Sequence, residues 1–113
     1  MIHTEPNWKS YMVETTEPIF TPEQCDIISK LGRAQPPQSA QVGTPSGGKH
    51  DTKTRISHIS WIPFDQPDSI QMYKKLEDMM HKTNRRHFGF QDMAINEQAQ
   101  YTEYPEGGFY DWH

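Results

Sequence analysis

Residues 98–113 constrain the fold of this chain more than any other segment does. They read QAQYTEYPEGGFYDWH, and bulky and polar side chains alternate through the first half of the segment, as they do in a half-buried strand. Pro-Glu-Gly-Gly at positions 105–108 predicts a turn, because glycine adopts the positive φ that tight turns need. The chain then extends again over residues 109–112. The sequence therefore predicts an aromatic β-hairpin that leads directly into His113.

Composition limits the class of protein. A length of 113 residues suits one domain, but hydrophobic residues make up only 33% of them and nine are prolines, which predicts extensive loops. A net charge of −4 argues against a nucleic-acid groove, which needs a basic stripe. We find no apolar run near the ~20 residues of a membrane span and no signal peptide. The single cysteine, Cys25, excludes an internal disulfide, suits a reducing cytoplasm and is expected on the buried face of a helix.

The clearest local signal predicts a helix over residues 20–31. Thr21 is an N-cap, Pro22 takes the first helical position and Gln24 completes a capping box. Gly32 is expected to end the helix. The apolar stripe consists of Cys25, Ile28 and Leu31 and is widened by Ile27.

A second helix is predicted over residues 65–86, with Pro67 and Asp68 in its first turn. Its apolar stripe, which is expected to pack on a sheet, consists of Ile70, Tyr73, Leu76 and Met80, flanked by Met72 and Met79. A basic cluster of His81, Arg85, Arg86 and His87 ends the helix. These cations complement the helix dipole, and a phosphate site is the alternative interpretation.

Strands are predicted over residues 54–63 and 94–104, the second of which enters the 105–108 turn, and a weaker one over residues 8–13. His58 is expected to be an ordinary sheet histidine.

Residues 34–53 are rich in Gln, Pro, Gly and Ser. A loop of this length is a lid, a binding loop or disordered. His50 and Asp51 could be metal ligands, but two adjacent side chains on a loop make a poor site. We therefore expect a flexible, lid-like loop.

The C-terminal segment resembles a known enzyme family. Five positions stand as in the Y-x-x-G-x-x-Y-x-x-H-x-D pattern of the prolyl-4-hydroxylase-like iron(II)/2-oxoglutarate dioxygenases, and the match is closest to the bacterial and phage branch. These positions are Tyr104, Gly107, Gly108, Tyr110 and His113. The resemblance implies an α+β fold: an incomplete double-stranded β-helix, or jelly roll, with two supporting helices packed on the major sheet. Residues 1–113 would then be the N-terminal half of one dioxygenase domain, ending two residues before its aspartate ligand.

The resemblance also implies roles for individual residues. His113 would be the first iron ligand, Tyr104 and Gln100 would bind 2-oxoglutarate, and Tyr110 and Arg55 would border the reacting centre; Glu97 and Trp112 would contact substrate. Two alternatives stay open. Arg55 could be solvated or paired with a carboxylate at a strand start. Glu97 and Tyr104 are seven residues apart, so a regular strand would point them to opposite faces unless a β-bulge intervenes.

The implied activity is hydroxylation of a prolyl or other peptide side chain, or of an amino acid, with Fe(II), 2-oxoglutarate and ascorbate. It would take place in the cytoplasm of a bacterium or of a phage-infected cell. The 113-residue chain is expected to be inactive alone and to associate with itself through open sheet edges. No nucleic-acid or membrane partner is expected. The alternative is a non-catalytic binding or assembly module that grips a partner through the aromatic hairpin 98–113.

Overall fold

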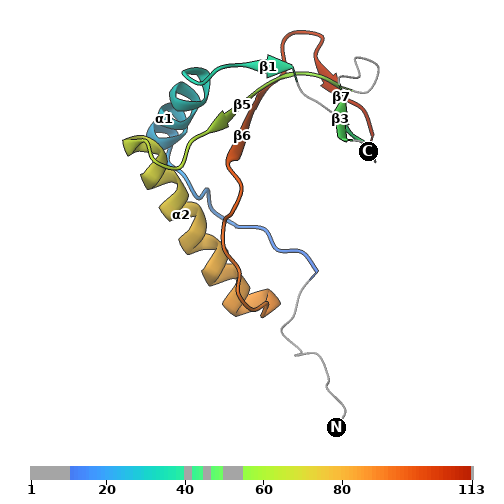
Figure 1. Ribbon diagram of the computed structural model, residues 1–113. Helices are drawn as coiled ribbons and strands as arrows, with labels where there is room; N and C mark the ends of the chain where they lie inside the picture. Colours follow the sequence, from blue (N-terminus) through green and yellow to red (C-terminus); the bar gives the residue numbers. More distant parts are fainter. Residues whose placement is uncertain (1–10, 40–41, 45–46, 50–54, 113) are drawn as a thin grey trace.

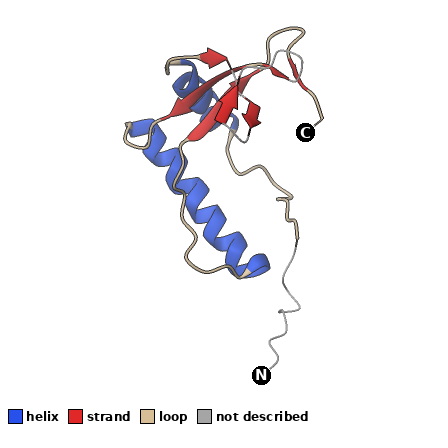
Figure 2. Cartoon of the chain, turned by 45° about the vertical axis from the view of Figure 1, so that its right-hand side comes forward, coloured by secondary structure: helices blue, strands red, loops and turns tan. Residues whose placement is uncertain are grey.

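The computed structural model describes residues 11–39, 42–44, 47–49 and 55–112. His113, His50, Asp51 and the predicted strand residues 8–10 lie outside the described residues. Within them the chain is a small α+β domain. Its elements are α1 (Pro22–Arg33), β1 (Gln38–Ser39), β2 (Val42–Thr44), β3 (Gly47–Lys49), β4 (Arg55–Ile56), β5 (His58–Ile62), α2 (Pro67–Thr83), the π-helical turn η1 (Asn84–Phe88), β6 (Ala99–Glu103) and β7 (Phe109–Tyr110). In Figure 2 the strands gather at one end of the molecule, and α2 extends away from them.

Helix α1 begins as the sequence predicts. The Gln24 backbone N–H donates to the Thr21 hydroxyl at 3.1 Å, and the Thr21 N–H donates to the Gln24 side-chain oxygen at 2.9 Å. Pro22 occupies the first turn, where its missing N–H needs no partner. The capping box is therefore confirmed. The helix continues through Gly32 and ends at Arg33, two residues beyond the predicted range 20–31.

The buried face of α1 is narrower than predicted. Leu31 and Gly32 are buried, whereas Cys25 is exposed, so its predicted burial was wrong. The physical reason lies in what covers the helix. The side chains of Ser60 and Tyr101 reach the last turn of α1, about two turns beyond Cys25.

Helix α2 presents a slightly different face from the predicted one. Ser69, Met72 and Tyr73 are buried, while Ile70 is 48% exposed. The buried face therefore shifts toward Ser69 and Met72, although it still includes the predicted Tyr73. Its hydroxyl donates to the Ile62 carbonyl at 2.6 Å and accepts from the Ala99 N–H at 2.7 Å. No helix in the described part of the chain is both long and apolar enough to cross a membrane.

The hydrophobic core joins both helices to the sheet. Its buried members are Leu31, Ile62, Met72 and Tyr73, and Phe20, Ile28, Leu76, Ile95, Ala99 and Tyr101 pack around them. Figure 1 shows α1 and α2 together along one side of β5 and β6.

The main sheet is antiparallel with strand order β1-β5-β6. Residues facing the helices alternate with residues facing away. Ser60 and its cross-strand neighbour Tyr101 face the helices. Trp61 and its neighbour Gln100 therefore lie on the opposite face, where Trp61 is 40% exposed. We call this second surface the helix-free face.

Several strand predictions need correction. The predicted strand 54–63 is interrupted at Ser57, which separates β4 from β5 and places them in different sheets. The predicted strand 94–104 begins only at Ala99. Tyr11, Met12 and Val13 form no strand and are exposed. Tyr11 and Met12 are 100% and 79% exposed and Val13 is 38% exposed beside α2, so no alternating buried face forms that would favour a strand.

The predicted loop 34–53 contains short β structure among its described residues. Gln38 and Ser39 form β1 and pair with Ile59 and His58, and β2 and β3 form a small hairpin. A lid function for this segment stays a prediction.

Gly32 permits the closest approach between α1 and the sheet. A Cβ atom added there would lie 2.3 Å from Cγ of Tyr101. Alanine is ordinarily favoured over glycine inside a helix by about 1 kcal/mol, but overpacking costs about 1–3 kcal/mol. We therefore predict that Gly32→Ala lowers the free energy of unfolding by up to about 2 kcal/mol, as measured by chemical denaturation.

Lys30→Ala, at an exposed position in the same helix, is the control and should change stability by less than about 0.5 kcal/mol. The double variant Gly32→Ala/Tyr101→Ala should lose less than the sum of its single changes, because the clash is gone. A stabilising Gly32→Ala would contradict the packing at this junction.

Candidate functional site

The two-stranded sheet of β4 and β7 brings together two of the residues that the sequence singled out. β4 and β7 pair antiparallel, with Arg55 opposite Tyr110 and Ile56 opposite Phe109. Figure 1 shows β7 beside the C-terminal end of the chain, away from both helices. Two positions that are far apart in the sequence thus become direct neighbours across strands.

This pairing corrects the predicted hairpin over residues 98–113. β6 and β7 do not pair with each other, because β6 pairs with β5 and β7 pairs with β4. His58 lies opposite Glu103, and Ile56 lies opposite Phe109. Between these two pairs the β4–β5 segment advances two residues, from Ile56 to His58, whereas the β6–β7 segment advances six, from Glu103 to Phe109. The β6–β7 segment therefore contains four extra residues. These correspond in number to the turn 105–108, which is an excursion within an extended strand.

Both glycines of this turn have a structural reason. The Gly108 N–H donates to the Pro105 carbonyl at 2.7 Å, which closes a β-turn. Gly107 has φ of 78°, as position i+2 of a type II turn requires. Gly108 does not have a positive φ, although a positive φ was expected for both glycines of this turn. It is needed because an added Cβ would lie 2.8 Å from the Ile56 carbonyl oxygen.

The predicted 2-oxoglutarate residues lie near one another along the chain. Gln100 stands opposite Trp61 on the helix-free face, and its side-chain oxygen accepts a hydrogen bond from the Thr102 hydroxyl at 3.1 Å. Tyr104 follows the last residue of β6 and is 50% exposed. Its ring is therefore accessible beside the turn.

The predicted substrate residues are more dispersed. Glu97 is exposed and precedes β6, so the alternation of a regular strand does not apply to it and no β-bulge is needed. Trp112 is 98% exposed. Its backbone N–H donates to the Asp111 carboxylate at 2.8 Å. Both substrate assignments stay predictions.

The described residues contain no group of three His, Cys, Asp or Glu side chains that could hold a metal ion. The predicted ligand His113 lies outside them. The described residues alone therefore do not fit an iron site.

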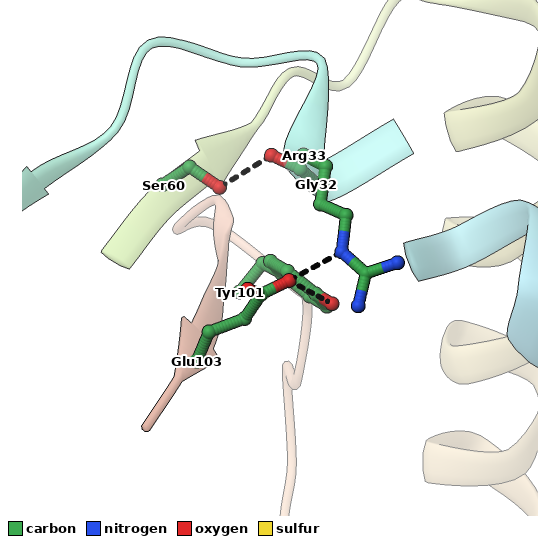
Figure 3. A network of polar contacts seen from close by, with 5 residues as sticks. All are labelled: Gly32, Arg33, Ser60, Tyr101 and Glu103. Carbon is green, nitrogen blue, oxygen red and sulfur yellow. Dashed lines mark hydrogen bonds and ion pairs between the residues drawn. The ribbon is translucent and has the colours of Figure 1, made fainter. Parts of the chain in front are cut away.

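A polar network on the helix side of the sheet was not foreseen from the sequence. The Arg33 side chain donates to the Glu103 carboxylate at 2.5 Å, and the Tyr101 hydroxyl donates to the same oxygen at 2.8 Å. Beside them the Ser60 hydroxyl donates to the Gly32 carbonyl at 2.7 Å. Figure 3 shows these side chains converging where the end of α1 meets β5 and β6. A pocket of about 320 Å³ adjoins the network.

The network changes the charge equilibria of its members. The hydrogen bond from Arg33, followed by that from Tyr101, holds the pKa of Glu103 below its ordinary value. The same bond to Glu103 raises the pKa of Arg33. Both groups are accessible to solvent, so the network acts as a surface latch between α1 and β6. Tyr101 and Glu103 share a face at strand spacing, but nothing local in the sequence points to Arg33.

No family model, curated protein or solved structure matches this chain.

The lowered pKa of Glu103 makes the latch sensitive to acid. Its contribution is complete above the ordinary carboxyl pKa of about 4.3 and is lost as the pH falls through the lower folded-state pKa. We predict that Glu103→Gln is less stable than the wild type at pH ~7 and that the difference shrinks by pH ~3. Urea denaturation at the two pH values measures this.

Glu106→Gln removes an exposed carboxylate from the 105–108 turn and is the matched control. It should change stability little at either pH. A loss for Glu103→Gln that is equal at both pH values would show that the carboxylate does not act through its charge.

Proposed function

We propose that this chain is part of an iron(II)- and 2-oxoglutarate-dependent dioxygenase that hydroxylates a prolyl or other peptide side chain. The observation that carries the proposal is the register of β4 and β7. It places Arg55 opposite Tyr110, three residues before His113, although the resemblance selected each of them independently. A hydroxylase needs such groups fixed on strands beside its reacting centre.

The arrangement of layers supports the jelly-roll part of the proposal. Both helices pack on one face of the sheet, while the helix-free face carries the partly exposed Trp61 and the exposed Gln100. A second sheet covering this face would complete a double-sheet domain and enclose the co-substrate against Gln100. That second sheet would come from residues other than those described.

The chain's own residues would mainly bind and orient. Tyr104, accessible at the end of β6, would donate its hydroxyl to a 2-oxoglutarate carboxylate, and Gln100 would contact it from the sheet. Tyr110 and Arg55 would border the substrate. Iron(II), held by His113 together with ligands from outside the described residues, would supply open coordination positions for the keto acid and oxygen. Ascorbate would maintain the reduced metal.

The reading frame beyond His113 provides the first test. The proposal predicts an aspartate two residues on, followed at a distance by a histidine and then an arginine or lysine. A protein that includes them should convert 2-oxoglutarate to succinate in the presence of Fe(II) and ascorbate, whereas the 113-residue chain alone should form no succinate. Succinate from the short chain would contradict the assignment of ligands beyond His113, and a stop codon after His113 would favour the alternative below.

Within the longer protein, Tyr104→Phe tests the co-substrate contact. Losing a hydrogen bond to a charged group costs about 1.5–3 kcal/mol, so the KM for 2-oxoglutarate should rise by about tenfold to a hundredfold. Tyr11→Phe removes a hydroxyl from a fully exposed ring and is the control, with unchanged kinetics expected. An unchanged KM in Tyr104→Phe would remove this residue from the proposed site.

A second candidate function is a non-catalytic assembly module that acts through residues 98–113. Two observations favour it: Trp112 is almost fully exposed, and β6 is an edge strand of its sheet among the described residues. Exposed edges recruit further strands. If this function is right, sedimentation velocity should show dimers whose fraction grows as the protein concentration is raised from about 1 μM to about 100 μM. A monomer throughout that range would count against self-assembly.

A further inference from the structure

One face of α2 carries a line of cations that neither the core nor the proposed active site uses. Lys75, Met79 and Lys82 follow one another at steps of four and three residues, which places them on a single stripe of α2, and Arg86, four residues after Lys82, extends this stripe into η1. Thr83 and His87 flank its C-terminal end. The stripe lines a pocket of about 680 Å³ whose other wall is the extended segment 13–19.

The C-terminal end of this pocket is built by a π-helical turn. After Thr83 the chain enters η1, and its last turn is closed by hydrogen bonds between the Asn84 side chain and both backbone groups of Phe90, at 2.7 and 2.8 Å. Gly89, with φ of 70°, ends the turn. Phe88 and Phe90 stack with ring centroids 5.9 Å apart. Arg86 and His87 are thereby held on a fixed backbone, and π-helical turns are frequent at functional sites.

The cations of the pocket have unused hydrogen-bonding capacity. Within the part of the chain that the structure describes, Lys82 and Arg86 form no ion pair and no hydrogen bond through their side chains. Lys75 donates to the Gln24 side chain at 2.9 Å and lies 5.2 Å from the centroid of the Phe20 ring, so its ammonium is engaged by residues outside this pocket. The helix dipole accounts for cations in the last turn, but Lys75 is in the middle of α2.

The opposite wall of the pocket, segment 13–19, carries acidic side chains that limit which anions can bind. Segment 13–19 contributes Glu14 and Glu17 to the pocket, together with the hydroxyls of Thr15 and Thr16 and the apolar side chains Val13 and Ile19. The two carboxylates oppose anions in general, so a bound anion must make close contacts with the helix. The Lys82 ammonium lies about one helical turn from the Arg86 guanidinium, and the His87 imidazole follows Arg86 directly in the sequence, so the three groups can surround a single tetrahedral anion.

We propose that this pocket binds an organic phosphate, with its phosphoryl group between Lys82, Arg86 and His87 and its organic part along Met79. The volume is within the range of small-ligand sites, about 300–1,000 Å³, and exceeds what inorganic phosphate alone would fill. The apolar side chains Met79, Val13 and Ile19 provide the surface for the organic part. This site is independent of iron and of the proposed hydroxylase chemistry.

The test uses the 113-residue chain and phenyl phosphate as the probe, with amide NMR shifts as the readout. Shifts should concentrate in residues 13–19 and 75–87, and phenyl phosphate should bind more tightly than inorganic phosphate because its ring contacts Met79. Sodium chloride at matched ionic strength should cause no such localised shifts. Equal effects of phenyl phosphate and chloride would overturn the proposal.

A matched pair of double variants separates the pocket from general charge. Lys82→Gln/Arg86→Gln removes two lining cations and should weaken phenyl phosphate binding at least about tenfold, since charge-assisted bonds to the anion are lost. Lys74→Gln/Arg85→Gln removes the same charge from exposed positions outside this pocket and should bind as the wild type does. Equal weakening in both would contradict a defined site.

Removing the opposing charge provides a gain-of-binding test that does not depend on a damaged helix. Glu14→Gln/Glu17→Gln should tighten phenyl phosphate binding severalfold, because both carboxylates line the pocket opposite the cations. Unchanged or weaker binding in this variant would place the anion elsewhere.

Discussion

The contact between the last turn of α1 and the β5–β6 pair determines how this domain is assembled. Gly32 leaves room for the Tyr101 ring, and its carbonyl accepts the Ser60 hydrogen bond. The same approach puts Arg33 within reach of Glu103. Tyr73 secures the other end of the strand pair through hydrogen bonds to both strands. Two helices are thus fixed on one side of the sheet, and on the helix-free face Trp61 stays 40% exposed although Ile59 is buried.

Features that depend on neighbouring residues could be predicted from the sequence. The capping box of α1 consists of two hydrogen bonds between Thr21 and Gln24, which are three residues apart. The turn at 105–108 likewise follows from proline and glycine chemistry within four residues. The exposed faces of the helices were harder to predict. Cys25 and Ile70 have the spacing of core residues, but which side of a helix is covered depends on where Tyr101 and Tyr73 meet it.

The pairing of the C-terminal strand shows the limit of local prediction most clearly. A Pro-Glu-Gly-Gly turn between two extended segments is compatible with a hairpin and with an excursion inside one long strand. The choice depends on β4, which is about fifty residues away in the sequence and offers its edge to β7. Gly108 favours this outcome because it allows the turn to lie against the Ile56 carbonyl. The Arg33–Glu103 ion pair was hidden for the same reason, since its partners are 70 residues apart.

The proposed function depends on this register, because only the excursion brings Arg55 opposite Tyr110, which stands three residues before His113 in the sequence. Cross-strand nuclear Overhauser effects between backbone protons measure the register directly in solution. We predict contacts of Arg55 with Tyr110 and of Ile56 with Phe109. Contacts instead between Glu103 or Tyr104 and Phe109 or Tyr110 would show a closed hairpin, which would separate the two predicted catalytic residues and contradict the account.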